Sequence, residues 1–218
     1  ELLAEADLAV IAAGFDTRAL LAASFPQAAA VPLTALRGQA AWGHAADLAA
    51  GADEGALPPF PVNGHGNFIP NAAGIWVTGS TFERGSASAT PTDEGHAANW
   101  QRLAELLPAA AARLQAQWPQ ARRFAAVRCA APDRLPFIGP LAPAFWQTAE
   151  AFEATAPAFE APWVYAGLGA RGIALSVLGA EVAACWLHGE PLPIEKSLAR
   201  HLLAERLKAS RRQTDCAA

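Results

Sequence analysis

Residues 163–186 read WVYAGLGARGIALSVLGAEVAACW, and this stretch decides how the rest of the chain is interpreted. Its glycines at positions 167, 169 and 172 match the pattern G-x-G-x-x-G, between an apolar run and a segment of helical character. In a dinucleotide-binding unit, a strand ending in an acidic residue follows such a turn after about 20 residues. The residues that follow here, HGEPLPIEKSLARHLLAERL, are helix formers rather than β-branched residues, so the pattern does not predict that unit.

Two interpretations of the turn are open on these residues alone. A glycine turn at the start of a helix offers free backbone N–H groups and the positive end of a helix dipole to an electron-rich ligand. The small residues are equally suited to close packing between the helix and the preceding strand. Both interpretations predict the same order of strand, turn and helix.

The composition is typical of a globular protein: 218 residues, 53% hydrophobic and 17% charged, with a net charge of −4. No apolar run reaches the roughly 18 residues of a membrane-spanning helix, and the acidic N-terminus does not resemble a signal peptide. The three cysteines are far apart and form no C-x-x-C pair, which favours a reducing, cytoplasmic setting. Neither they nor the five histidines have metal-ligand spacing, so no metal site is predicted.

Hydrophobic patterns and turn residues predict an α+β protein with mostly antiparallel strands around one helix. Strands are expected at 8–13, at 33–44 with a glycine break, in a hairpin that turns at 71–74, at 122–130 and at 163–166. Helices are expected after residue 16, from Thr90 to about 107, to about 188 and over 194–210, with loops at 45–61 and 141–161. Thr90 is the expected N-cap, with Pro91 in the first helical position and Asp93 in capping-box position. Strand–helix segments at both ends suggest one layer interrupted by an inserted sheet domain.

Several motifs, taken in order along the chain, resemble the FAD-dependent amino-acid oxidases of the D-amino-acid oxidase (DAO) superfamily. They are LAVIAAG (8–14), LRGQ (36–39), GNFIP (66–70), WVTGSTFERG (76–85), VRCAAPDRLPFIGP (127–140) and GLGARGIALSVLGAEVAA (167–184). The cysteine after the arginine in VRCA, together with TGSTFERG and GLGARG, is most similar to one branch. That branch is the oxidoreductase half of the bifunctional tRNA 5-methylaminomethyl-2-thiouridine biosynthesis family. The resemblance covers nearly the whole chain.

The resemblance implies a DAO-like fold, an incomplete FAD-binding α/β layer with an inserted substrate-domain sheet. Residues 1–30 would belong to the FAD-binding layer, 31–125 to the antiparallel sheet domain, and 126–218 to a return into the first layer that ends in helices. The superfamily's first nucleotide-binding unit carries its own glycine motif and acidic residue, and neither occurs before residue 8. We therefore expect a fragment that lacks this N-terminal unit and the methyltransferase domain; the absence of methionine agrees with this.

The resemblance also implies which residues contact the cofactor. The glycine turn would face the flavin ring of FAD, and the N-terminus of the next helix would lie near the part of the ring that gains negative charge on reduction. Arg171 could contact the flavin or the substrate, or face solvent. The expected cofactor-binding residues are Ala13, Gly14, Gly167, Leu168, Gly169, Ala170, Arg171, Gly172 and Ile173.

For the substrate, the resemblance implies that Arg128 holds a carboxylate, because a planar guanidinium pairs bidentately with that group. A structural salt bridge, for instance with Asp133, is the alternative, and Asp133 itself is interpreted as a turn-former. Asn67 and Phe68 fall where relatives line the pocket, although a hairpin core residue explains Phe68 better.

The reaction that the resemblance implies is oxidation of an amine with FAD, followed by hydrolysis of the imine. The substrate would be carboxymethylaminomethyluridine at the wobble position of a tRNA, which would lose its carboxymethyl arm and become aminomethyluridine. Two alternatives are kept: an oxidase or dehydrogenase of a small free amino acid such as glycine or a D-amino acid, and a non-catalytic binding module. Because the net charge is −4, tRNA contact would depend on local clusters such as Arg122-Arg123 and the tail at 208–212, or on other domains.

Overall fold

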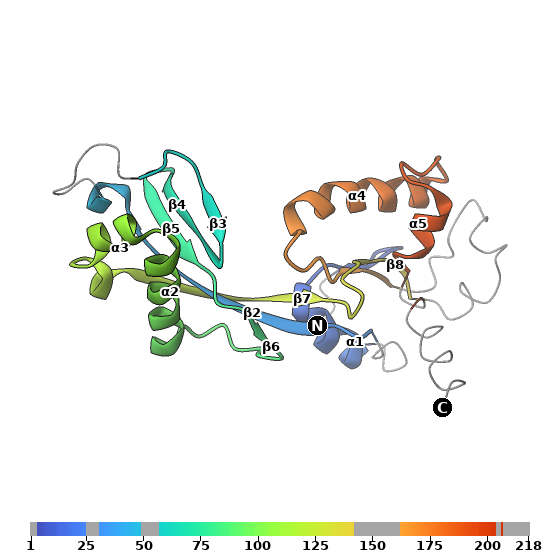
Figure 1. The fold of residues 1–218 in the computed structure, drawn as a ribbon. Coiled ribbons are helices and arrows are strands. Elements are labelled where there is room, and N and C mark those ends of the chain that lie inside the picture. Colours follow the sequence, from blue (N-terminus) through green and yellow to red (C-terminus); the bar gives the residue numbers. More distant parts are fainter. Residues whose placement is uncertain (1–3, 25–30, 49–56, 142–161, 204–205, 207–218) are drawn as a thin grey trace, which may run out of the picture. The chain divides into compact units, whose positions relative to one another are not determined.

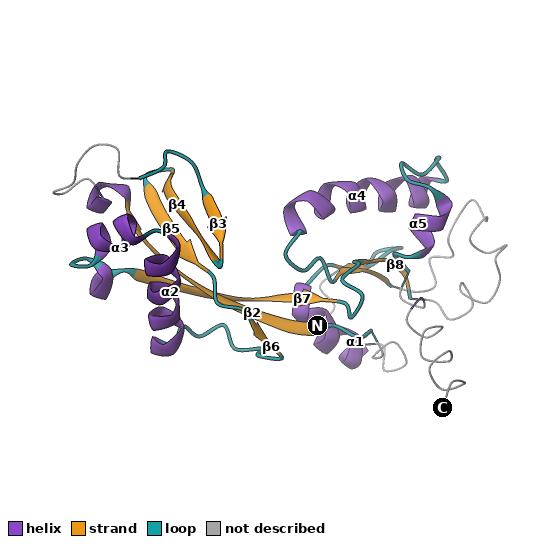
Figure 2. Ribbon diagram, viewed as in Figure 1, coloured by secondary structure: helices purple, strands orange, loops and turns teal. Residues whose placement is uncertain are grey.

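The computed structural model describes residues 4–24, 31–48, 57–141, 162–203 and 206 (Figure 1). By its internal contacts the chain divides into two compact units, one from Glu1–Thr34 and Arg128–Ala218 and the other from Ala35–Val127. Both units combine helices with antiparallel strands (Figure 2), which confirms the predicted α+β class.

The first unit contains a three-stranded sheet in the order β1-β9-β8. Its strands are β1 (Val10–Ile11), β9 (Trp163–Ala166) and β8 (Phe137–Pro140). The first two are parallel and the last is antiparallel to its neighbour, so the sheet is mixed. The strand expected at 8–13 is formed as β1, over two residues only.

Helices follow both of the parallel strands. After β1 come a 3-10 turn (Gly14–Asp16) and α1 (Thr17–Ser24), and after β9 come α4 (Gly172–His188) and α5 (Lys196–Arg200). The left-handed conformation of Gly189, with φ of 67°, ends α4, as is common at helix C-termini. Of the helix expected over 194–210, the described part is α5, followed by a turn at 201–203; residues 204–205 and 207–210 lie outside the described residues.

Two hydrophobic clusters hold this unit together. The larger consists of Leu21, Val31, Leu33, Cys129, Ala131, Phe137, Val164 and Ala166. The smaller joins Trp163, Trp186 and Leu203, and the two indole rings meet edge to face with centroids 5.6 Å apart. Both clusters include residues of β9, so this short strand is buried on both faces.

The second unit is built on a sheet in the order β3-β4-β5-β2-β6, with β7 also paired with β2. Its strands are β2 (Thr34–His44), β3 (Val62–Gly64), β4 (Gly66–Ala72), β5 (Ile75–Gly79), β6 (Glu83–Arg84) and β7 (Arg122–Ala130). The end of β7, from Arg128 on, belongs to the first unit. The expected glycine break in β2 is wrong, because the strand runs without interruption through both of its glycines. Gly43 instead makes room for the ring of Trp76 on β5, which a β-carbon would approach to 2.8 Å.

The hairpin expected to turn at 71–74 is confirmed as β4 and β5. Ala72 pairs with Ile75, which leaves Ala73 and Gly74 as a two-residue turn with φ of 52° and 83°. Two successive positive φ angles define the tight turn whose twist matches that of the strands. The Gly74 N–H donates to the side chain of Asn71, which stabilises the turn.

The helices of this unit are α2 (Asp93–Leu106) and α3 (Pro108–Leu114), with 3-10 segments at Ala45–Leu48, inside the expected loop, and Trp118–Gln120. They and the sheet enclose a core that consists of Ala41, Leu48, Phe68, Trp76, Leu103, Ala110, Ala111, Leu114 and Trp118. The N-cap of α2 is Thr92, whose hydroxyl accepts from Gly95 N–H, so the prediction of Thr90 is wrong.

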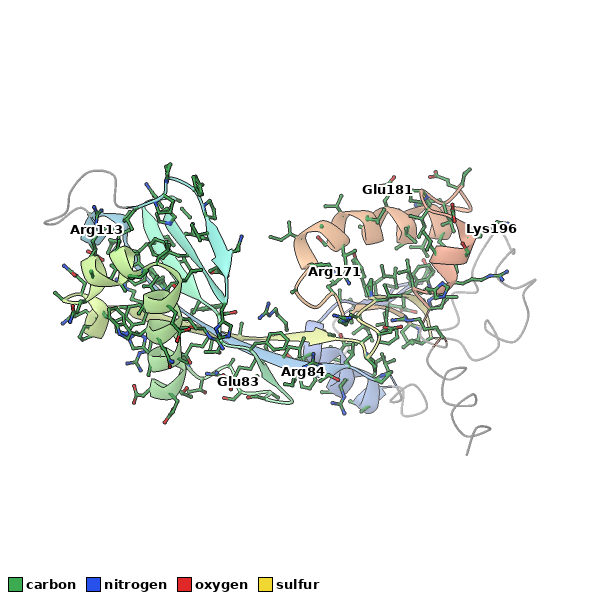
Figure 3. All side chains as sticks on the ribbon, in the orientation of Figure 1. Glu83, Arg84, Arg113, Arg171, Glu181 and Lys196 are labelled. Carbon is green, nitrogen blue, oxygen red and sulfur yellow. The ribbon has the colours of Figure 1, made fainter. Side chains whose placement is uncertain are left out.

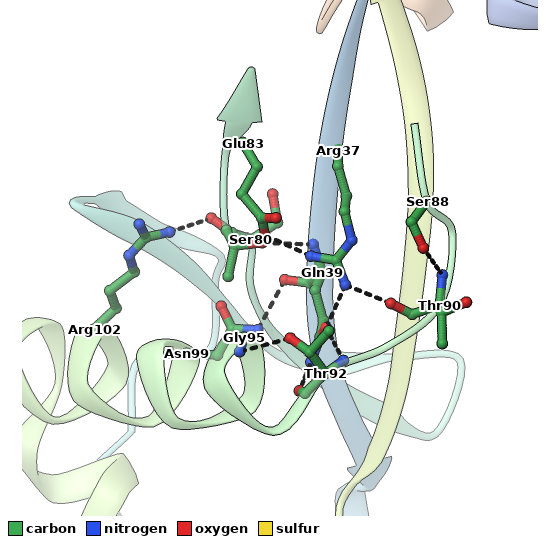
Figure 4. A network of polar contacts seen from close by, with 11 residues as sticks. Arg37, Gln39, Ser80, Glu83, Ser88, Thr90, Thr92, Gly95, Asn99 and Arg102 are labelled. Carbon is green, nitrogen blue, oxygen red and sulfur yellow. Dashed lines mark hydrogen bonds and ion pairs between the residues drawn. The ribbon is translucent and has the colours of Figure 1, made fainter. Parts of the chain in front are cut away.

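A buried polar network explains where α2 begins (Figure 4). The guanidinium of Arg37, 2% exposed, donates to the Thr90 carbonyl, to Gln39 and to Glu83. The side chain of Gln39 in turn exchanges two hydrogen bonds of 2.8 Å with the backbone of Thr92. These contacts to strand β2 tie down the backbone of Thr90 and Thr92, and Thr92 itself is extended, so the helix begins only after it.

Candidate active site

The candidate cofactor residues of the first unit lie at one edge of its sheet. Ala13 and Gly14 follow β1, and Gly167 directly follows β9. Since these two strands are parallel, their carboxyl ends meet at the same edge, where ligands bind in many α/β proteins. Gly14 adopts φ of 58°, and a β-carbon there would meet no atom within 4 Å. The space beside this residue is open among the described residues.

The glycine turn is fastened to the end of β7. Gly167 and Gly169 adopt φ of 79° and 58°, which explains why glycine is needed at both positions. Gly169 N–H donates to the carbonyl of Cys129 at 2.8 Å, and Gly167 N–H donates to the sulfur of the same residue at 3.3 Å. Ala130 and Leu168 add an antiparallel bridge. The turn is therefore held in register with residues 129 and 130.

Helix α4 begins immediately after this turn, and no side chain caps its N-terminus. Arg171, labelled in Figure 3, occupies the N-cap position. Its guanidinium donates to the Arg134 carbonyl at 2.8 Å. The first N–H groups of the helix and its positive dipole end thus lie beside a turn made of small residues. Ile173 in the first turn is 92% exposed.

Arg128 lies near the end of β7 and is half-buried. Its chain neighbour Cys129 accepts two hydrogen bonds from the glycine turn, one at its carbonyl and one at its sulfur. Burial raises the pKa of the Cys129 thiol, which is therefore protonated at neutral pH. The N-terminus of α4 beside this turn favours a bound anionic group.

Asp133, proposed as the structural partner of Arg128, forms a bidentate pair with Arg206. It also accepts from Leu135 N–H at 3.1 Å, which confirms its interpretation as a turn-former. Burial would raise the pKa of this carboxyl, but the hydrogen bonds and charge of Arg206 and the Leu135 amide outweigh it and lower the pKa.

Asn67 and Phe68 lie in the other unit, on β4. The Phe68 side chain is fully buried and packs in the core with Trp76 and Leu103, which agrees with the core interpretation. Asn67 is half-buried and points to the opposite face of its strand, because neighbouring residues of a strand alternate between faces.

Sequence reasoning missed Arg206 and the contacts of Cys129. The guanidinium of Arg206 also lies 4.2 Å from the ring centre of Phe137 and donates to the carbonyls of Leu135 and Leu203. Asp133 and Leu135 are 73 and 71 residues away from it in the sequence, so no local pattern could have revealed these two contacts. In the sequence, Cys129 stands out only as part of the VRCA motif, and nothing there indicates its contacts with the predicted glycine turn.

Within the described ranges, no group of three or more His, Cys, Asp and Glu side chains could hold a metal ion. Among the helices that the structure describes, none combines the length and apolar character needed to cross a membrane.

The chain belongs to the DAO family of FAD-dependent oxidoreductases, whose family model matches residues 2–186. It is 46% identical over 219 residues to the tRNA 5-methylaminomethyl-2-thiouridine biosynthesis bifunctional protein MnmC of Paracidovorax citrulli (strain AAC00-1). It is 44% identical over 221 residues to the protein of the same name from Delftia acidovorans (strain DSM 14801 / SPH-1). These matches cover 95% and 94% of this chain but 31% of each relative, so the chain spans about a third of their length.

Solved structures share the fold. Glycine oxidase from Geobacillus kaustophilus superposes with a TM-score of 0.62 at 19% identity, over 92% of this chain and 46% of that one. L-proline dehydrogenase from P. horikoshii gives a TM-score of 0.61 at 18% identity, over 93% of this chain and 47% of that one. The DAO-like fold predicted from the sequence motifs is confirmed.

Proposed function

We propose that this chain is part of an FAD-dependent oxidoreductase that removes the carboxymethyl arm of carboxymethylaminomethyluridine at the tRNA wobble position, leaving aminomethyluridine. The observation that carries the proposal is the hydrogen-bonded contact between the glycine turn and the end of β7, beside Arg128. Relatives that are 44–46% identical and named for biosynthesis of a tRNA nucleoside support the choice of substrate. With tRNA as substrate, the protein would act in the cytoplasm, together with a methyltransferase domain and a first nucleotide-binding unit.

The residues of the sheet edge fit a flavin. Gly169 has positive φ, carries no β-carbon and is half-buried, so a planar ring can approach its backbone closely. The uncapped N-terminus of α4 can stabilise negative charge on a bound group. Ala13 and Gly14 would contact another part of the cofactor, and residues 167–173 would contact the ring. When bound, the flavin would accept the hydride from the carbon next to the substrate amine.

Arg128 would hold the carboxylate of the substrate arm through a bidentate pair and so orient the adjacent carbon. Asn67, half-buried on β4, is kept as a proposed substrate contact, whereas the fully buried Phe68 belongs to the core of the second unit. A small free amino acid carries the same carboxylate, so Arg128 alone does not decide between the two substrates. Choosing between the modified tRNA and a free amino acid requires that both substrates be compared with the same protein.

The test is flavin reduction under anaerobic conditions by the full-length protein. Carboxymethylaminomethyluridine-containing tRNA is expected to bleach the flavin absorbance far faster than glycine, sarcosine or D-alanine. Apparent KM for tRNA should rise steeply with added salt, since phosphate contacts release counterions, while KM for a small zwitterion barely changes. Fast reduction by a free amino acid and none by the tRNA would replace the proposal with an amino-acid oxidase. A protein that holds no flavin would favour a non-catalytic module.

Replacing Arg128 tests the substrate role. Arg128→Ala is expected to lower kcat/KM by about a hundredfold or more while flavin stays bound, because a charge-assisted bidentate pair is lost. Arg128→Lys should restore only part of the activity, since an ammonium lacks the planar fork. Arg84→Ala, which removes an exposed arginine of β6, is the control. Unchanged kcat/KM in Arg128→Ala would make the residue structural.

A further inference from the structure

We propose that Cys129 is a positioning residue, which holds the glycine turn at a fixed place relative to Arg128. The inference rests on the proposed function, in which the turn faces the flavin and Arg128 binds the substrate carboxylate. The spacing between these two groups decides whether the reacting carbon meets the cofactor, and one residue connects them.

The first argument is geometric. Cys129 accepts two hydrogen bonds from the turn, at its carbonyl from Gly169 N–H (2.8 Å) and at its sulfur from Gly167 N–H (3.3 Å). Its side chain is 6% exposed and lies in the core with Leu33 and Phe137. Cys129, which directly follows Arg128 in the chain, thus holds the turn through two hydrogen bonds.

The second argument concerns the need for a side chain at this place. The ladder between β8 and β9 ends with the pair Phe137 and Ala166, so the amide of Gly167 lies one residue beyond it. Gly167 is buried, and a buried amide without an acceptor costs about 1–3 kcal/mol. The sulfur supplies that acceptor. It also restrains a segment that has two glycines at positive φ and little conformational preference of its own.

The third argument is that packing alone does not fix the turn. A β-carbon on Gly167 would lie 3.4–3.5 Å from Leu33, Ala131 and Phe137, which is ordinary van der Waals distance, so the glycine itself is not tightly packed there. The two hydrogen bonds to Cys129 therefore restrain the turn where close packing does not. Serine keeps an acceptor at this position, whereas alanine keeps the backbone carbonyl contact and removes only the side-chain one.

The experiment uses the full-length protein with Cys129→Ala and Cys129→Ser. Cys185→Ala, which truncates the other buried cysteine of the described chain, is the matched control. Amide hydrogen exchange of a peptide spanning 166–172 is measured in flavin-free protein. The flavin absorption spectrum, KM and kcat are measured in loaded protein.

Cys129→Ala is expected to speed exchange of the turn about tenfold or more, shift the flavin bands and lower kcat/KM about tenfold to a hundredfold, mainly through KM. Cys129→Ser should lie close to wild type, and Cys185→Ala should change none of these readouts. If Cys129→Ala exchanges like wild type, Cys129 does not hold the turn and the proposal is overturned.

Faster exchange with an unchanged spectrum and KM would make the contact structural only, and would also overturn a positioning role. A wild-type protein without flavin or activity would contradict the proposed function. The exchange measurement would then still show whether Cys129 holds the turn, so the two failures are distinguishable.

Discussion

Arg206 fixes the loop that follows Arg128, because its side chain contacts several groups distant in the sequence. Its side chain is 7% exposed, pairs with both carboxylate oxygens of Asp133 and lies over the ring of Phe137. A guanidinium suits this place since it combines a bidentate fork with a flat face that stacks on aromatic rings. The same loop contains Arg134, whose carbonyl accepts from Arg171 at the start of α4.

Arg206→Ala is expected to lower the free energy of unfolding by about 2–3 kcal/mol, because a mostly buried pair is broken and Asp133 loses its compensating charge. Arg123→Ala is the matched control. Its partner Asp93 is 88% exposed, and an exposed pair contributes less than about 1 kcal/mol. Denaturant unfolding of both variants is the measurement. Equal losses would show that the Arg206 pair contributes no more than a surface pair.

The sequence predicted the role of a residue where its contacts are to near neighbours in the chain. Asp133 was expected to form a turn, and its side chain does accept from Leu135 two residues on. The partnership between Asp133 and Arg206 joins residues 73 positions apart, so it depends on the completed fold. The same holds for Gly43, whose missing side chain is explained only by the ring of Trp76 on another strand.

At the scale of elements, the packing of α4 on its sheet depends on Gly179. A β-carbon at this position would lie 2.5 Å from both the Ile138 side chain and the Tyr165 hydroxyl. That hydroxyl donates to the carbonyls of Leu175 and Ser176, so it anchors the same helix. Gly179 is therefore needed for close packing between α4 and the sheet, whereas Gly167 and Gly169 are needed for the backbone conformation of the turn.

Gly179→Ala is expected to lower the free energy of unfolding by about 1–3 kcal/mol, since the helix must move away from β8 and β9. Intrinsic helix propensity alone predicts the opposite, a gain of about 1 kcal/mol. Gly172→Ala is the control, because its β-carbon would come no closer than 4.0 Å to Leu168. Thermal unfolding decides between the two. A more stable Gly179→Ala would mean that propensity outweighs the contact.

Elements with strong local signals were predicted well. The hairpin of β4 and β5 follows from its turn residues, and α4 follows from the glycine turn before it. The start of α2 was placed two residues early because Thr90 and Pro91 form a good local capping signal. Hydrogen bonds from Arg37 and Gln39 on β2 prevail over that signal, and they connect residues 53 positions apart.

At the scale of the whole molecule, each unit has its own core with buried tryptophans, Trp163 and Trp186 in one and Trp76 and Trp118 in the other. The family followed from the combination of motifs along the chain, whereas no single motif would have been specific. The α+β class was predictable because turn chemistry and strand periodicity are local. Carboxylate and flavin binding depend on groups that the completed fold brings together, and the sequence pattern alone does not identify them.

Global stability is expected to depend on pH through His96 in the core of the second unit. Its ring stacks on Trp118 with centroids 4.6 Å apart, and its Nε2 bonds to the Trp118 carbonyl. Burial lowers the pKa of His96 below its usual value. The carbonyl opposes this shift, Arg123 adds to it and Asp93 opposes it. The folded protein therefore keeps the ring neutral at a pH where the unfolded chain protonates it.

The sign follows from proton uptake: below about pH 6.5 the unfolded state binds the extra proton, so the free energy of unfolding falls as pH falls, by at most about 1.4 kcal/mol per pH unit. Above that pH this contribution is constant. The loss from Asp133, whose pKa is also lowered, belongs to a more acidic range, below about pH 4. Denaturant unfolding between pH 5 and 8 measures the effect, and His96→Gln, which retains a donor for the Trp118 carbonyl, should flatten the curve. An equally steep curve in His96→Gln would assign the pH dependence to other groups.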